Sequence, residues 1–196
     1  MKKIISIALA LVVLMACKKD VVEPTVESTS LKITVLDDTG NKISNASVKL
    51  FETENDYLSE TNQVSNTMTT NSSGEVLFDN LSNKKYYWHI EKDCLNNVNT
   101  AYTSASVLQL NKANTINTIV KENGDLEIVN TTSDTYKVYI NNEELGDISG
   151  NSTEYLYYID NGTYSIQIIQ QDGYILTPTN VTSTFNISCG VNIVSI

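Results

Sequence analysis

The chain has 196 residues and is acidic, because 13 lysines and no arginine stand against 23 Asp and Glu, giving a formal charge of −10 at pH 7. Without arginine it lacks the side chain that binds phosphates and bases in a bidentate way, so we expect no nucleic-acid partner. Hydrophobic residues make up 41% of the chain, enough for packed cores, and the length allows one large domain or two small ones.

The first seventeen residues have the pattern of an export signal. Lys2 and Lys3 give a positive start, residues 4–15 are apolar but too few to span a bilayer, and the small Ala16 precedes Cys17. The run Leu14-Met15-Ala16-Cys17 resembles the lipobox of bacterial lipoproteins. The resemblance implies removal of residues 1–16 as a signal peptide and attachment of a diacylglycerol to the Cys17 sulfur.

Lipidation would make the protein an outer-membrane lipoprotein of the bacterial cell envelope. Each buried methylene contributes about 0.8 kcal/mol, so several acyl chains on Cys17 hold a protein firmly at a membrane. The alternative is a plain secretory signal that is cleaved nearby without lipid. Cleavage after residue 16 removes two lysines, so the formal charge becomes −12.

Residues 17–30 are polar and lack apolar periodicity, which predicts a flexible lipidated tether. Fully extended, its dozen or so residues reach roughly 40 Å. Asp20, close behind Cys17, resembles the surface-export signals of some Gram-negative lipoproteins, but Lys18 and Lys19 come first. The periplasmic and the surface-exposed face of the outer membrane both stay open.

Beyond the tether, apolar and polar residues alternate in short runs bounded by Asn, Asp, Gly and Ser, which is typical of β-strands. The clearest runs are 31–35, 46–50, 75–78, 86–91, 126–129, 136–140, 155–159, 164–169, 184–188 and 191–196. Turns are predicted at 38–41 and 71–74. We expect an all-β protein of two tandem small antiparallel β-sandwiches, at residues 31–122 and 123–196.

The first unit follows a recognisable order of motifs. The first predicted strand is followed by the turn at 38–41, by two further strands and then by an aromatic strand. The motifs along this order are Ile43-Ser44-Asn45-Ala46, Gly74-Glu75-Val76-Leu77-Phe78 and Tyr86-Tyr87. Over residues 31–95 this order resembles the transthyretin-like sandwiches, which include carboxypeptidase-regulatory-like and Cna-B-like modules. These are non-catalytic stalk, accessory or adhesive domains of exported proteins. Residues 95–121 fit the resemblance poorly.

Some Cna-B-like domains crosslink a first-strand lysine to a late asparagine by an isopeptide bond, assisted by a carboxylate. Glu91 stands where the resemblance places the carboxylate. Val35, however, occupies the lysine position, and Lys32 lies three residues earlier, on the other face of the strand. We therefore expect no isopeptide bond.

The second unit resembles a PEGA-type module, a small surface-associated β-sandwich. The resemblance is carried by the runs Gly124-Asp125-Leu126-Glu127-Ile128, Tyr136-Lys137-Val138-Tyr139-Ile140-Asn141, Asn161-Gly162-Thr163-Tyr164 and Gln171-Asp172-Gly173-Tyr174. The Pro-Glu-Gly-Ala tetrad that names the family is absent, with Ile159-Asp160-Asn161-Gly162 in its place. The resemblance implies binding or architecture and no reaction.

Catalytic and metal-binding patterns are missing from the sequence. His89 is the only histidine, and with Trp88 and Ile90 facing the core we expect it on the outer face, solvated beside Tyr87 and Glu91. No nucleophile motif accompanies it. An enzyme would have to be a hydrolase with two carboxylates about 5 to 10 Å apart in a cleft. We expect no enzyme and no cofactor.

Metal-ligand spacing is equally absent, since the single histidine and the distant cysteines form no zinc pattern. Asp37 and Asp38 lack the alternating oxygen ligands of a calcium loop, so we interpret them as turn residues. For Cys94 and Cys189, one in each predicted unit, two interpretations remain. The alternation of Cys189 with Phe185 and Ile187 favours separate buried thiols, and the alternative is a disulfide between the units.

Tyrosines are the remaining lead, because 11 of them stand beside one tryptophan and 3 phenylalanines. Outward side chains can stack on sugars or anchor a protein contact; the candidates are Tyr87, Tyr139, Tyr155 and Tyr157. Simple cross-strand pairing is the alternative. We expect a non-catalytic, lipid-anchored envelope protein with a structural or protein-interaction surface, or else a glycan-binding accessory lipoprotein that uses these tyrosines.

Overall fold

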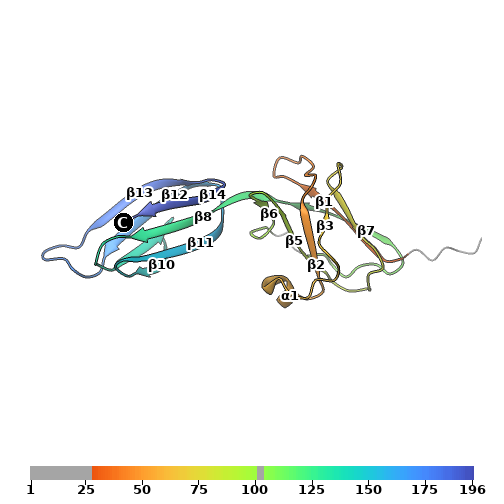
Figure 1. Cartoon of the computed structure of the whole chain (residues 1–196), viewed down its shortest axis with the longest axis horizontal. Helices are drawn as coiled ribbons and strands as arrows, with labels where there is room; N and C mark the ends of the chain where they lie inside the picture. The colour runs from red at the N-terminus through yellow and green to blue at the C-terminus, as the bar shows by residue number, and fades with distance from the viewer. Residues whose placement is uncertain (1–27, 101–103) are drawn as a thin grey trace, which may run out of the picture.

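The computed structural model describes residues 28–100 and 104–196. In this part of the chain the regular structure is all β, apart from one short helix, α1 (Glu54–Ser59). Two β-sandwiches follow one another along the long axis of the molecule (Figure 1). The predicted signal peptide, Cys17 and most of the predicted tether lie outside the described residues.

The N-terminal sandwich is built from two sheets. The strands are β1 (Ser30–Leu36), β2 (Ser47–Phe51), β3 (Met68–Thr69), β4 (Glu75–Phe78), β5 (Tyr87–Lys92), β6 (Leu95–Asn96) and β7 (Ala113–Ile119). One sheet has the order β4-β1-β7, and the other contains β3-β2-β5-β6. The strand β7 lies parallel to β1, so part of the segment that fitted the family resemblance poorly completes this sandwich.

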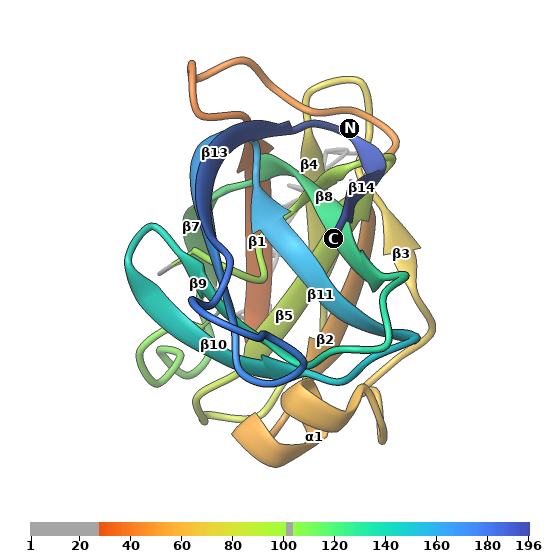
Figure 2. The same cartoon turned by 90° about the vertical axis from the view of Figure 1, so that its left-hand side faces the viewer.

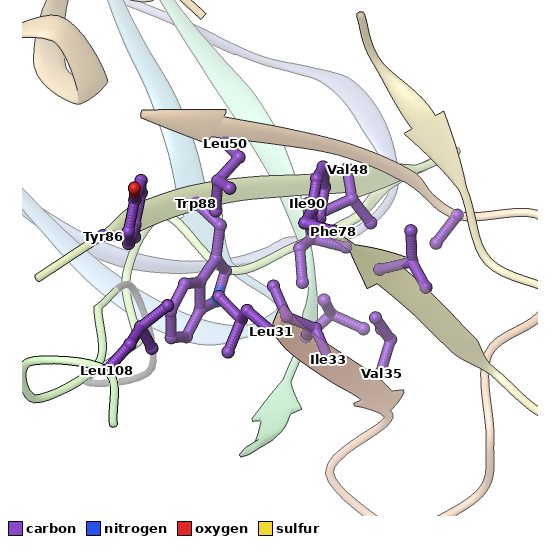
Figure 3. Packing of buried hydrophobic residues seen from close by; sticks show 13 residues of the cluster. Leu31, Ile33, Val35, Val48, Leu50, Phe78, Tyr86, Trp88, Ile90 and Leu108 are labelled. Atoms are coloured by element: carbon purple, nitrogen blue, oxygen red, sulfur yellow. The ribbon is translucent and has the colours of Figure 1, made fainter. Parts of the chain in front are cut away.

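Alternation explains the core between these two sheets. In β1 the side chains of Leu31, Ile33 and Val35 are at most 1% exposed, and in β5 Trp88 and Ile90 are fully buried. Figure 3 shows these side chains pointing toward one another from the facing sheets. The sequence prediction that Trp88 and Ile90 face the core is confirmed.

The C-terminal sandwich has its own core. Its strands are β8 (Lys121–Asn130), β9 (Tyr136–Ile140), β10 (Glu143–Ile148), β11 (Ser152–Asp160), β12 (Gly162–Gln170), β13 (Asn180–Ile187) and β14 (Gly190–Ser195). One sheet has the order β10-β9-β12-β13, and the facing sheet places β8 between β11 and β14. Leu126, Ile128, Val138 and Ile187 form the centre of the core between them.

The strand β8 belongs to both sandwiches. Its first two residues, Lys121 and Glu122, pair with β6, and from Asn123 onward the strand pairs with β11 and β14. One continuous sheet therefore runs from β3 through β5 and β8 to β11, and its outer face extends over both units (Figure 1). Figure 2, viewed along the long axis, shows β8 and β11 crossing in front of β5 and β2.

The predicted strands largely match the observed ones, and most pairs are antiparallel. The sequence analysis missed β3, β6, β7 and β10, because these strands are very short or lack clear alternation of apolar residues. It also missed α1, which begins after Thr53 where the Thr53 hydroxyl accepts a hydrogen bond from the Asp56 N–H at 3.1 Å. Within residues 28–100 and 104–196, no helix is long and apolar enough to cross a membrane.

Candidate functional site

The two sandwiches are tied together by a disulfide. Cys94, in the turn between β5 and β6, is bonded to Cys189, in the turn between β13 and β14, and their Cα atoms are 5.5 Å apart. The prediction of separate buried thiols is therefore wrong. Pairing of β6 and β14 with the same strand, β8, brings the two turns together.

A buried amide pair lies beside this disulfide. The side chains of Asn96 and Asn123, both 4% exposed, donate hydrogen bonds to each other's carbonyl oxygens, and Asn123 Nδ2 lies 3.0 Å from Asn96 Oδ1. The Asn123 backbone N–H also donates to the Cys94 carbonyl at 3.0 Å. Buried amides that satisfy each other fix the register of the strands that carry them, so the joint is held by polar contacts as well as by the covalent bond.

A β-bulge in β11 places two consecutive tyrosines at this joint. The register with β8 shifts between Leu156 and Ile159, and Tyr158 adopts a left-handed conformation with φ 57°. Its N–H donates to Asp125 Oδ1 at 3.1 Å, and its carbonyl accepts from the side chain of Asn99 in the N-terminal sandwich. The bulge breaks the alternation of the strand, so Tyr157 and Tyr158 line the same hollow.

This hollow is a pocket of about 230 Å³ at the joint. Its lining comes from both sandwiches and consists of Glu91, Asp93, Cys94, Asn96, Asn123, Gly124, Asp125, Tyr157, Tyr158 and Gly190. The lining contains three carboxylates and no lysine. Burial raises the pKa of the Tyr158 phenol, and the charge of the Glu91 carboxylate is the next largest cause.

Tyr155 continues the surface along β11. Its ring and that of Tyr157 have centroids 6.4 Å apart and planes within 10°, and both residues are more than half exposed. The neighbouring Glu127 carboxylate raises the pKa of the Tyr155 phenol, whose hydroxyl donates to Glu127 Oε1 at 3.4 Å. We use the term joint surface for seven residues: Glu91, Asp93, Asp125, Glu127, Tyr155, Tyr157 and Tyr158.

The other two candidate tyrosines lie elsewhere. Tyr87 is on the outer face of β5, half-buried, with its ring 6.3 Å from that of Tyr57 and with Lys85 Nζ 4.5 Å from its centroid. Tyr139 is on β9, in the other sheet of the C-terminal sandwich, with its hydroxyl 3.5 Å from Glu144. The structure thus brings together two of the four predicted tyrosines and adds Tyr158.

His89 faces away from the core but is not solvated, so that part of its prediction is wrong. Only 5% of the residue is exposed, because Glu60, the residue that follows α1, packs against it. His89 Nδ1 lies 2.9 Å from Glu60 Oε1, and Lys49 Nζ lies 2.5 Å from Glu60 Oε2. The hydrogen bond from Lys49 is the main reason why the pKa of Glu60 is lowered.

Asp37 has the structure of a turn residue. Its carboxylate accepts hydrogen bonds from the backbone N–H groups of Thr39 and Asn41 at 3.0 and 2.8 Å, and from both side chains. These bonds, the side-chain ones first, lower its pKa to about 2. Asp38 is exposed in the same turn. Among the described residues no group of His, Cys, Asp and Glu could hold a metal ion.

The positions relevant to an isopeptide bond are occupied as follows. Val35 is fully buried in β1, and Lys32 lies on the other face, where Nζ is 3.2 Å from Glu75 Oε1. Glu91 lies on the exposed outer face of β5, across the sheet from the core. Val35, Lys32 and Glu91 therefore do not lie together in the core, where the crosslink of a Cna-B-like domain would require a lysine and a carboxylate.

No protein-family model matches the sequence, and no curated protein matches it either. Among solved structures, the chain is similar to a streptococcal ancillary pilin, with a TM-score of 0.42 and 15% identity over 88% of this chain and 63% of that one. It is also similar to the Bacillus anthracis TIE protein, with a TM-score of 0.39 and 17% identity over 87% of this chain and 33% of that one. A third similar structure is the minor pilin GBS52 of Streptococcus agalactiae, with a TM-score of 0.32 and 15% identity over 86% of this chain and 94% of that one.

These scores are too low to support an inference about function, and the chain spans 63% or less of the length of the first two proteins. What the joint surface can do follows from its own chemistry. Phenol rings offer flat contact area with a polar edge, and carboxylates attract cations or accept hydrogen bonds from hydroxyl groups. The sequence analysis missed Tyr158, Asp93 and Asp125, because only the bulge and the shared strand bring them together.

Proposed function

We propose that the protein is a non-catalytic, lipid-anchored protein of the bacterial cell envelope that binds a partner protein through the joint surface. The observation that carries the binding proposal is an acidic and aromatic surface that extends over both sandwiches. The disulfide and the shared strand β8 fix the two halves of this surface relative to each other. A surface fixed before binding loses little entropy when its partner arrives.

The chemistry of the surface defines the partner. Exposed tyrosines are typical anchors of protein interfaces, and the carboxylates without a lysine in the pocket lining favour a positively charged segment opposite them. A partner with Lys or Arg next to apolar side chains meets both features. The absence of a nucleophile motif in the sequence and the engagement of His89 by Glu60 support a non-catalytic role.

Lipid anchoring is supported by the run Leu14-Met15-Ala16-Cys17. Intact-mass analysis of the native protein from membrane extracts tests this part, together with a Cys17→Ser variant. We expect a chain that begins at Cys17 and carries acyl chains, and a variant that is released from membranes. A native protein of unmodified mass would contradict the anchor without affecting the binding proposal.

Capture experiments test the binding part. A soluble fragment of residues 21–196 is used to capture proteins from solubilised envelopes, beside the variants Tyr155→Ser/Tyr157→Ser and Tyr139→Ser. The last is a matched control, because Tyr139 lies on the other sheet of the same sandwich. We expect a protein that the wild type and Tyr139→Ser retain and that the double variant loses. Equal recovery with all three fragments would reject the joint surface as the binding site.

A glycan is the second candidate ligand, since the two nearly parallel rings of Tyr155 and Tyr157 lie beside the hydrogen-bond-accepting Glu127. Aromatic faces stack on sugar rings, and carboxylates accept bonds from sugar hydroxyls. Binding of the same three fragments to an array of envelope polysaccharides distinguishes the ligands. Glycan binding would be insensitive to salt, whereas binding to a cationic protein weakens as salt rises.

A further inference from the structure

The loop between β12 and β13 carries the two most exposed large hydrophobic side chains of the described residues. In this loop, residues 171–179, Ile175 is 96% and Leu176 is 90% exposed, and the adjacent Tyr174 is 47% exposed. The loop projects from the end of the C-terminal sandwich that faces away from the N-terminal sandwich (Figure 1). We call residues 174–176 the apolar tip.

Hydrogen bonds hold the base of this loop in place. Two hydrogen bonds between Gln170 and Thr179 close the loop. The Gln170 N–H donates to the Thr179 carbonyl at 2.8 Å, and the Thr179 N–H donates to Gln170 Oε1 at 3.2 Å. Asp172 Oδ1 accepts from the Thr135 N–H at 2.7 Å, and Asp134 Oδ2 accepts from Gln170 Nε2 at 2.7 Å. A fixed base presents the apolar tip to solvent, so a binding partner does not have to order the ends of the loop.

The base also requires a glycine. Gly173 has φ 74°, and a Cβ built on it would lie 2.2 Å from Asp134 Oδ1. The glycine therefore lets the chain turn closely past Asp134 and lead into the apolar tip. Together with the hydrogen bonds, this close approach holds a loop that ends in the almost fully exposed side chains of Ile175 and Leu176.

The charged residues around the apolar tip indicate which kind of binding partner it favours. No charged side chain occurs between residues 173 and 196, and the carboxylates of Asp172 and Asp134 lie at the loop base. Residues 122–196 contain ten Asp and Glu and a single lysine, Lys137, which is paired with Glu144 and Asp147. Such a surface is repelled by anionic lipids and by a second copy of the chain, and attracted by a cationic rim.

We propose that the apolar tip inserts Ile175 and Leu176 into an apolar pocket with a basic rim on a partner protein. This binding site is separate from the joint surface. The proposal does not depend on a lipid anchor at Cys17, which belongs to the proposed function. The charge argument stands without the anchor.

Photocrosslinking in cells tests the proposal with the full chain. A benzophenone amino acid replaces Leu176 and, in a control, Leu58, which is 72% exposed on α1. We expect one adduct with the mass of a discrete protein at position 176, and no such adduct at position 58. An adduct with a phospholipid, an adduct of twice the chain mass, or no adduct would each overturn the proposal.

Affinity measurements with the purified partner identified from that adduct complete the test. We expect Ile175→Asn/Leu176→Asn to bind roughly tenfold or more weakly, and the wild type to lose affinity as salt rises. Val191→Asn, at an exposed position on β14, is the matched control and should bind normally. Tyr155→Ser/Tyr157→Ser should also bind normally, so failure here is distinguishable from failure of the joint surface. Equal binding by the tip variant would overturn the proposal.

Sedimentation with vesicles tests the competing target directly. The purified full chain is mixed with vesicles of phosphatidylcholine alone and of phosphatidylcholine with phosphatidylglycerol. The Cys17→Ser substitution prevents acylation, and we expect the protein with this substitution to stay in the supernatant with both kinds of vesicle. Co-sedimentation that the Ile175→Asn/Leu176→Asn change abolishes would overturn the protein-pocket proposal in favour of a lipid surface.

Discussion

Cys94 and Cys189 are 95 residues apart in the sequence, and their disulfide joins the turn after β5 to the turn before β14. The bond lies next to the point where β8 passes from one sandwich to the other. A strand alone would let the two sandwiches bend about it, whereas a strand and a covalent bridge together resist bending. This arrangement makes the joint surface a fixed feature of the molecule.

Replacing both cysteines by alanine should destabilise the protein and loosen the joint. A bridge across about a hundred residues restricts the unfolded chain, and native disulfides typically contribute about 2–4 kcal/mol. Chemical denaturation of wild type and Cys94→Ala/Cys189→Ala measures the free energy of unfolding, and small-angle scattering measures the spread of shapes. Unchanged stability together with an unchanged scattering profile would show that the bridge has no structural role.

Gly124→Ala should disturb the same joint from within β8. A Cβ at this position would lie 2.0 Å from the Ser188 carbonyl oxygen and 2.8 Å from that of Gly190, and both are backbone atoms. We expect a loss of about 1–3 kcal/mol in the free energy of unfolding, as for other overpacked positions. Ser195→Ala, at the exposed end of β14, is the control, with an expected change within about 0.5 kcal/mol. Equal stabilities of the two variants would contradict the close approach.

The turn at residues 37–41 should respond to acid at an unusually low pH. The pKa of Asp37 is lowered to about 2 by hydrogen bonds from Thr39 and Asn41. A carboxyl whose pKa is depressed in the folded state stabilises the fold above its unfolded pKa of about 3.9, and this contribution is lost as the pH falls toward 2. Carboxyl carbon shifts of Asp37 measured by NMR between pH 5 and 1.5 test this. A midpoint near 3.9 would contradict the turn geometry.

Tyr155 should ionise only at a pH above the usual range for tyrosine. The Glu127 carboxylate opposes the charge of the phenolate and raises the pKa of Tyr155. A Glu127→Gln variant removes that charge, so its Tyr155 should ionise at lower pH than in the wild type. NMR titration of the ring carbon that bears the hydroxyl reports the pKa in both proteins. The same pKa in both would place Glu127 outside the joint surface.

Local alternation predicted much of the fold. In runs such as 31–35 and 136–140 apolar residues alternate with polar or partly exposed ones, so their period of two is visible in the sequence. The strand β7 carries mostly Asn and Thr, and β6 has two residues, so neither shows that pattern. The helix α1 has no buried residue and hence no apolar period, although Thr53 followed by Asp56 is a capping signal.

The candidate site could not be predicted in full, because it is formed by tertiary contacts that local sequence patterns do not reveal. The outward direction of His89 follows from alternation, but its burial comes from α1, thirty residues earlier in the chain. The disulfide depends on which strands share β8, and sequence spacing does not give that order. Tyr158 adopts a left-handed conformation that favours glycine or asparagine, so nothing in the residue type announced the bulge.

The affinity of the captured partner protein for the joint surface is the most direct test of the proposed role. Titrations of wild type, Tyr155→Ser/Tyr157→Ser and Tyr139→Ser are carried out at low and at high salt. We expect the double variant to bind roughly ten- to a hundredfold more weakly than the wild type, Tyr139→Ser to bind as the wild type does, and salt to weaken wild-type binding. Equal affinity of the double variant and the wild type would contradict the account.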